Sequence, residues 1–188
     1  MNRMAWGKSL QTLSSMLVAA AFAVHSAAAL ASTELKIPTP KGFVAFSVGG
    51  DWPVLSMQMK MPIASAAFRI PNPADAGGSD SSNIVIALYD SHSAEARKAF
   101  KTPVKQYGPT RAVAQAHGPW TVYRQAALQG ETHYTIVDAK RKGVGDVAVG
   151  VRMVWPQLAA NDADYDARMQ AQFMAVLDSI HGGSSVPP

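Results

Sequence analysis

Hydrophobic and polar residues alternate with a period of two along three stretches of the chain, 55–61, 64–70 and 147–155. Side chains point to alternate faces along a β-strand, so each stretch is predicted to be a half-buried strand. Pro62 separates the first two stretches. They are therefore expected to form either one long bent strand or two consecutive strands.

Other segments are predicted to be strands for different reasons. The opening segment 32–51 is punctuated by Pro and Gly and holds one short apolar piece, 43–48, which predicts a single strand. Residues 83–89 are apolar on both faces, which is typical of a central strand covered on both sides. Residues 120–128 and 132–137 are strand-like and are separated by a Gly-Glu pair, so they are predicted to form a hairpin.

Two helices are predicted. Ser93 is a good N-cap for the first. The second covers 165–180, where apolar residues recur at steps of three and four and form one stripe. Asn161 or Asp162 is expected to cap its start, and Gly182 is expected to end it.

The first 31 residues have the pattern of a secretory signal peptide. Two basic residues precede an apolar run, 16–24, and small residues stand at Ala29 and Ala31, where signal peptidase requires them. The run is about half as long as the ~20 residues that span a bilayer, so a retained anchor is the less favoured reading. We expect 1–31 to be a removed signal peptide and 32–188 to be a single exported domain, periplasmic or secreted, with no stable membrane span.

Composition excludes several classes of protein. The chain has no cysteine, which excludes a disulfide framework and a lipidated N-terminal cysteine. The leader holds two of the 17 Lys and Arg residues and none of the 13 Asp and Glu residues, so the exported part has a net charge of +2. Nucleic acid is not an expected partner, because its binders concentrate Lys and Arg on one face. We expect one α+β domain with an antiparallel sheet of about five to seven strands, packed helices and the C-terminal helix across the sheet.

Short motifs accompany this order of elements. Ile37-Pro38 opens the domain, Gly50-Asp51-Trp52 precedes the first long strand, and 173–180 ends the last helix. In these motifs and in the order of its predicted elements, the chain resembles the PsbP-like or DcrB-like family over most of residues 35–181. Members of that family are binding and assembly modules, so the resemblance implies a scaffold for contacts. No catalytic residue of the family matches this chain.

Three methionines, Met57, Met59 and Met61, are the sharpest candidates for metal chemistry. On one strand face they would present three thioethers, which are soft ligands that select Cu(I). The alternative is that they fill the core face of an amphipathic strand, for which Met is well suited. We favour core filling, and expect no cofactor and no tight Cu(I) binding.

Catalytic motifs are absent from the sequence. It has no Cys nucleophile, no Gly-x-Ser-x-Gly and no zinc-protease spacing of His residues. A triad assembled from distant residues, such as Ser93, His117 and Asp138, stays open because triads are defined by geometry. The sequence does not favour it, so we expect a protein that is not an enzyme.

Five residues are candidates for binding a partner. Lys140, Arg141 and Lys142 are predicted to form a basic hairpin tip that could attract an acidic surface or simply be a solvated turn. Trp52 and Trp120 stand where loops meet strands, and either could anchor a ligand or pack in the core.

The leading functional hypothesis is a non-catalytic exported envelope protein that acts as a protein-binding or assembly module. One alternative is an immunity or inhibitor protein against an envelope-targeted toxin or hydrolase. Another is a carrier of a small ligand or of Cu(I).

Overall fold

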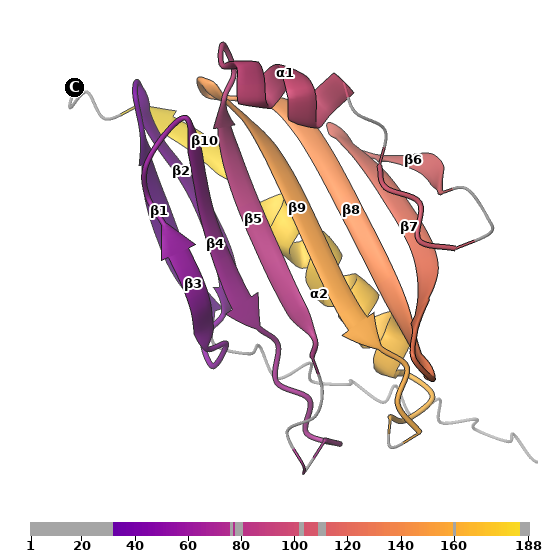
Figure 1. Ribbon diagram of the computed structural model, residues 1–188. Coiled ribbons are helices and arrows are strands. Elements are labelled where there is room, and N and C mark those ends of the chain that lie inside the picture. The colour runs from indigo at the N-terminus through magenta and orange to yellow at the C-terminus, as the bar shows by residue number, and fades with distance from the viewer. Residues whose placement is uncertain are drawn as a thin grey trace, which may run out of the picture.

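A seven-stranded antiparallel sheet forms the centre of the molecule. The computed structural model describes residues 32–75, 77, 81–101, 104–108, 112–159 and 161–184. The sheet order is β3-β4-β5-β9-β8-β7-β6 (Figure 1). The strands are β3 (Val54–Gln58), β4 (Ile63–Arg69), β5 (Asn83–Asp90), β6 (Val113–His117), β7 (Trp120–Gln129), β8 (Thr132–Val144) and β9 (Val147–Pro156).

A second, three-stranded sheet lies beside the first. Its order is β1-β2-β10, made of β1 (Ser32–Thr39), β2 (Gly42–Gly49) and β10 (His181–Ser184). Strand β10 approaches β2 so closely that a Cβ at Gly42 would collide with the backbone oxygen of Gly183. The C-terminal end of the described chain is therefore tied to its N-terminal hairpin.

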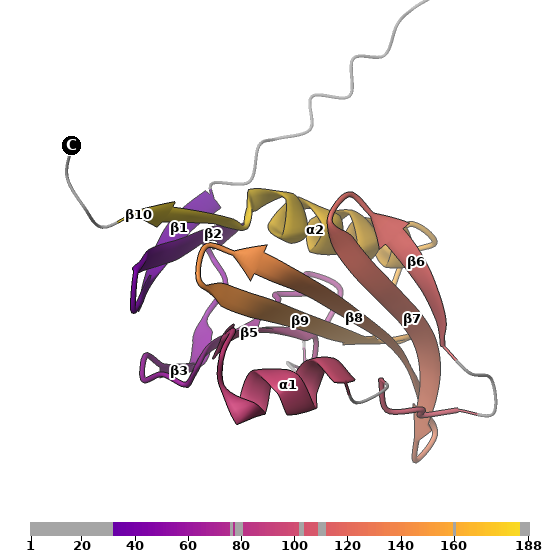
Figure 2. The same ribbon diagram turned by 90° about the horizontal axis from the view of Figure 1, so that it is seen from above.

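Two helices lie on opposite faces of the large sheet (Figure 2). Helix α2 (Tyr165–Ser179) crosses one face, and α1 (Ala94–Lys101) covers one end of the other. The hydrophobic core lies between the large sheet, α2 and β2. Phe173 of α2 is fully buried there, and Phe46 of β2 meets Phe68 of β4 edge to face with ring centroids 6.4 Å apart.

The expected fold class is confirmed: the domain is α+β and its C-terminal helix lies across an antiparallel sheet. Strand dominates more than expected, and there are two sheets rather than one. The opening segment forms two strands instead of one, because 32–39 pairs along its whole length with 42–49. The last helix ends at Ser179, and Ile180 is already extended, so Gly182 lies in β10 and does not end the helix.

Strand β5 departs from its predicted environment. Ile84, Ile86 and Leu88 are fully buried, whereas Val85 and Ala87 on the other side are only half-buried. The strand is central in the sheet, as predicted, but it is not covered equally on both sides.

The predicted signal peptide, 1–31, lies outside the described residues. Within the part of the chain that the structure describes, no helix is long and apolar enough to cross a membrane.

Candidate functional site

The face of the large sheet opposite α2, called here the open face, carries small side chains at its centre. In the antiparallel register, Ser65 of β4 pairs with Ala87 of β5, and Ala87 pairs with Gly150 of β9. Paired residues of neighbouring strands point to the same face, so these three form one row across the sheet. A row of small residues leaves space above it.

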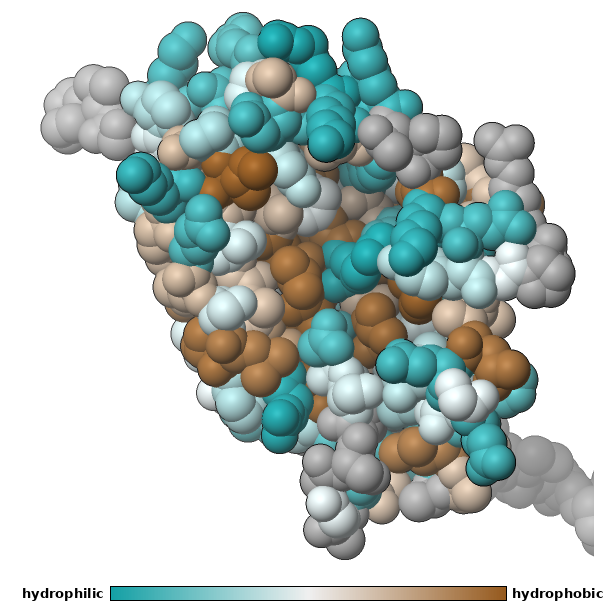
Figure 3. All heavy atoms as spheres, in the orientation of Figure 1, coloured by the Kyte–Doolittle hydropathy of each residue, from teal (hydrophilic) through white to brown (hydrophobic). Residues whose placement is uncertain are grey.

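That space is a cavity of about 720 Å³ between α1 and the strands β5, β9 and β8. We call it the open-face hollow. Its floor includes Val85, Ala87 and Gly150, and its lining is mostly apolar. Figure 3 shows apolar patches on this face, at its middle and toward its edges, with hydrophilic side chains between them. This volume lies in the range of small-molecule sites, which are about 300–1,000 Å³.

Helix α1 forms one wall of the hollow and is fixed by local contacts. The Ser93 hydroxyl accepts a hydrogen bond from the Ala96 amide at 3.0 Å, which confirms the predicted N-cap. Phe100, on the inner side of α1, packs edge to face on Tyr89 of β5 with centroids 5.9 Å apart. Burial raises the pKa of the Tyr89 hydroxyl. This aromatic pair helps to hold the C-terminal end of the helix on the sheet.

Arg152 of β9 lies in the next row of the open face. It pairs across strands with Asp138 of β8, and its Nε donates to the Asp138 carboxylate at 2.7 Å. Its Nη1 donates to the hydroxyl of Tyr107 at 3.0 Å. Burial alone would lower the pKa of the Arg152 guanidinium, but the hydrogen bond and charge of Asp138 outweigh burial and raise it. Arg152 is therefore a fixed cation whose charge Asp138 balances.

Lys140 approaches the hollow from β8. Its Nζ donates to the backbone oxygen of Ala99 in α1 at 2.7 Å and lies 5.8 Å from the centroid of the Phe100 ring. Burial lowers the pKa of the Lys140 ammonium, Asp138 opposes that shift, and Arg152 adds to it. An additional anion near Lys140 would favour its charged form.

Residues 104–108 bound the hollow on the side of β7. Gln125 of β7 clamps them: its Oε1 accepts from the Tyr107 amide at 3.1 Å, and its Nε2 donates to the Lys105 carbonyl at 2.9 Å. The Lys105 ammonium lies 4.9 Å from the centroid of the Tyr107 ring. The hollow thus has a fixed border on this side as well.

Lys140, Arg141 and Lys142 do not form a shared hairpin tip, because β8 continues to Val144 and the turn that follows is at Gly145 and Asp146. Alternation along the strand separates the first two side chains. Lys140 lines the open-face hollow, and Arg141 Nη1 donates to the Ile180 carbonyl, after the end of α2, at 3.3 Å. Lys142 is exposed.

Both tryptophan candidates are in the core, which agrees with the packing alternative. Trp120 is buried at the start of β7, with the Arg141 guanidinium 5.7 Å from its ring centroid. Trp52 packs against Gly49, where a Cβ would lie 2.3 Å from the indole Nε1. Neither indole is placed to anchor a ligand at the open-face hollow.

The methionine candidates are not held on one strand. Strand β3 ends at Gln58, and Met57 and Met59 are 42% and 45% exposed, while Met61 packs partly against the core. The expectation that all three fill the core is therefore wrong for Met57 and Met59. Among the described residues, no group of three or more His, Cys, Asp or Glu is arranged to hold a metal ion.

The three residues named above as a triad from distant parts of the chain each have another contact. Ser93 caps α1, Asp138 holds Arg152, and His117 Nε2 lies 2.8 Å from Asp178 of α2. The structure does not bring the three together.

Sequence reasoning missed Arg152 and Lys98 as site residues. A signal was present in β9, where Ala148, Gly150 and Arg152 alternate with large apolar residues. Small and charged side chains on one face of a central strand indicate a face that is not packed against a hydrophobic layer.

Comparisons with known proteins identify no relative by sequence: no protein-family model and no curated protein matches the chain. Two solved structures are similar at low identity. One, a protein from Bacteroides thetaiotaomicron, has a TM-score of 0.45 and 13% identity over 76% of this chain and 46% of its own. This chain thus spans about half the length of that protein.

The other is LpqN of Mycobacterium tuberculosis, described as involved in cell envelope biogenesis. It has a TM-score of 0.43 and 11% identity over 80% of this chain and 91% of its own. The resemblance to the PsbP-like or DcrB-like family stays a prediction.

Proposed function

We propose that this chain is an exported, non-catalytic binding protein of the cell envelope that holds a small apolar ligand in the open-face hollow. The observation that carries the proposal is the hollow itself, about 720 Å³ of mostly apolar space over a row of small residues. Apolar pockets with a few polar groups are the usual form of ligand sites. The predicted signal peptide supports export. Ser93, His117 and Asp138 are each hydrogen-bonded to residues outside the triad, which supports a role other than catalysis.

A neutral fluorescent probe tests this function. We would titrate the purified chain with N-phenyl-1-naphthylamine, whose emission rises in apolar surroundings, and compare Gly150→Leu with the wild type. A Cβ at Gly150 meets only Tyr89, at 3.7 Å, so a larger side chain fits and fills the hollow. Ala126→Leu is the control, because Ala126 is an exposed β7 residue that does not line the hollow.

The wild type and Ala126→Leu are expected to bind the probe equally, and Gly150→Leu at least about tenfold more weakly, because that substitution occupies the space. Circular dichroism of the three proteins should be the same. Absence of probe binding by the wild type, or unchanged binding by Gly150→Leu, would refute the proposed function.

A second candidate is a protein-binding module, and β3 favours it. This strand is an outer strand of the large sheet, and it carries the large exposed apolar residues Val54, Leu55 and Met57, with exposed Met59 directly after it. An open edge with apolar side chains can add a strand from another protein. The partner would therefore contribute an extended, apolar segment.

Site-specific photocrosslinking distinguishes this candidate. A crosslinking amino acid at Met57 should give one stoichiometric adduct in cells. The same amino acid at Leu128, an exposed apolar residue of β7, should not. Equal patterns at the two positions would contradict docking at β3.

A further inference from the structure

The charges around the open-face hollow are unbalanced. Four cationic and two acidic side chains line it: Lys98, Lys105, Lys140 and Arg152 with Glu95 and Asp138. The Arg152 charge is balanced by Asp138 at 2.7 Å. Apart from that pair, the lining holds three lysines and one glutamate. The positive charge is therefore concentrated in lysines.

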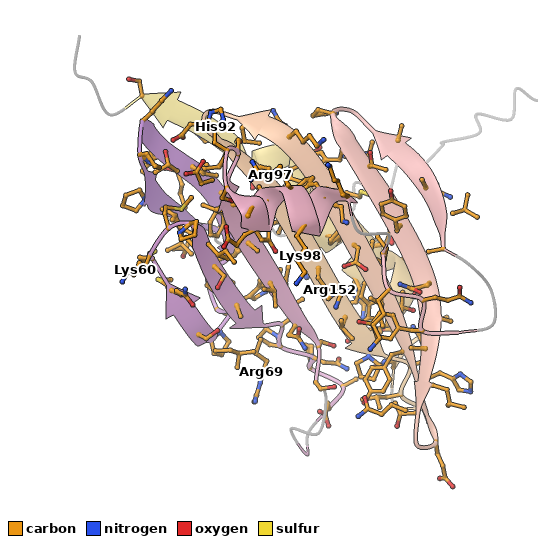
Figure 4. All side chains as sticks on the ribbon, turned by 45° about the horizontal axis from the view of Figure 1, so that its top comes forward. Lys60, Arg69, His92, Arg97, Lys98 and Arg152 are labelled. Carbon is orange, nitrogen blue, oxygen red and sulfur yellow. The ribbon has the colours of Figure 1, made fainter. Side chains whose placement is uncertain are left out.

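Two of these lysines lie at the α1 end of the hollow. Lys140 donates to the carbonyl of Ala99, which is the residue next to Lys98 in the chain. Lys98 is exposed on α1, and Figure 4 shows it directed from the helix over the open face, on the same side as Arg152. An anion at this end of the hollow would face two ammonium groups that come from different elements.

The remainder of the hollow is apolar. Its floor includes Val85, Ala87 and Gly150, and Ile63 of β4 borders it. A ligand that satisfies both regions must have an apolar body and an anionic end. A multiply charged polar ligand would leave the apolar floor uncovered, and a neutral hydrocarbon would not be attracted by the positive charge of the lining.

We infer that the ligand is an anionic amphiphile, a single apolar chain that ends in a carboxylate or a phosphate, with its anionic end at Lys98 and Lys140. This inference rests on the proposed function, because it names the class of ligand for the same hollow. The apolar chain lies along the row of small residues on β5 and β9. Lys98 selects the charged end, and the row of small residues accommodates the chain.

Competition against the neutral probe tests the inference. Dodecanoate, dodecyl phosphate and dodecanol share one chain and differ in the end group, so each is titrated below its micelle concentration at neutral pH. At least one anion should displace the probe at about tenfold lower concentration than dodecanol. Preference for dodecanoate indicates a fatty acid as the source, and preference for dodecyl phosphate indicates a phospholipid head group.

Substitutions on α1 locate the anionic end. Lys98→Glu should remove the preference for the anion, measured as the ratio of its affinity to that of dodecanol for the same variant. Lys101→Ala is the matched control, because Lys101 is an exposed lysine on the same helix that does not line the hollow. It should keep the preference.

Two results would overturn the inference. In one, dodecanol competes as well as both anions. In the other, Lys98→Glu and Lys101→Ala have the same preference as the wild type. Both require that the neutral probe binds, so they differ from failure of the proposed function, in which the probe itself does not bind.

Discussion

The two faces of the seven-stranded sheet are built by the same strands and differ in almost every respect. On the face covered by α2, β5 contributes Ile84, Ile86 and Leu88, all fully buried. On the open face the same strand contributes Val85 and Ala87, which are half-buried under a short helix. Large apolar side chains interlock on the first face and give stability. Small side chains on the second leave a hollow, so the sheet keeps its fold while one face is free to bind.

On each face a strand arginine forms an ion pair with an aspartate, and the two pairs have different roles. On the covered face, Asp166 of α2 accepts from Arg124 of β7 at 2.7 Å and from the buried Trp155 indole at 3.0 Å. It joins the helix to the sheet. On the open face, Asp138 accepts hydrogen bonds from the Arg152 side chain at the edge of the hollow. The first pair fixes α2 to the sheet, and the second positions a cation beside a cavity.

The largest expected difference between the faces is in how much one phenylalanine of each helix contributes to the free energy of unfolding. Phe173→Ala should lower the free energy of unfolding by about 3–5 kcal/mol, because it leaves a cavity in the core. Phe100→Ala should lower it by less than half as much, about 1–2 kcal/mol, because Phe100 is half-exposed and packs mainly on Tyr89. Urea unfolding of both variants measures this, and equal losses would mean that α1 is as structural as α2.

The next largest effect is expected at the pair that joins α2 to the sheet. Asp166→Asn should lower the free energy of unfolding at neutral pH by about 1–2 kcal/mol, because Arg124 and Trp155 lose a charged acceptor. The control is Asp164→Asn, at the same helix end, where the side chain makes no cap hydrogen bond. It should cost less than about 0.5 kcal/mol.

This stabilisation is expected to depend on pH. Burial alone would raise the pKa of the Asp166 carboxyl, but hydrogen bonds from Arg124 and Trp155 outweigh burial and hold the pKa below the ordinary 3.8. A carboxyl with a lowered pKa in the folded state stabilises the fold above the ordinary pKa, and the contribution is lost as pH falls through the lowered one. Wild type and Asp166→Asn should therefore converge in stability in acid. A difference that persists there would show that Asp166 acts through packing rather than charge.

Much of the covered face could be predicted from the sequence. The apolar stripe of α2 and the alternation of residues in β9 each indicate burial against a hydrophobic layer. The structure has both elements at the residues that these patterns predict. Strands β1, β6 and β10 were missed. Sequences such as His181-Gly-Gly-Ser have no apolar pattern, and β10 forms because it pairs with β2 across more than a hundred residues of chain.

The open-face hollow could not be predicted in the same way. Val85 and Ala87 are apolar, and sequence alone does not distinguish an apolar side chain under a helix from one beside a cavity. The hollow arises from register, which aligns Ala87 with Gly150 and Arg152 with Asp138. Arg152 in an otherwise apolar strand was the available signal. The basic run at 140–142 is evident in the sequence, but the length of β8 determines the direction of its side chains.

The smallest expected effect concerns that basic run, and it tests whether its residues act on separate faces. Lys140→Ala should lower the free energy of unfolding by about 0.5–1 kcal/mol, because it loses the hydrogen bond to Ala99 and the contact with Phe100. Arg141→Ala should cost a similar amount through its carbonyl and indole contacts on the other face, and Lys142→Ala should change stability by less than about 0.5 kcal/mol.

Because Lys140 and Arg141 contact different elements, the double variant should show the sum of the two single effects within about 0.3–0.5 kcal/mol. Urea unfolding of the three single variants and the double variant measures both the ranking and the additivity. Equal and negligible changes in the free energy of unfolding of the three single variants would support the alternative of one solvated basic tip. Strong coupling between Lys140 and Arg141 would show that the two faces of β8 are not independent, in which case a ligand in the open-face hollow would also act on the end of α2.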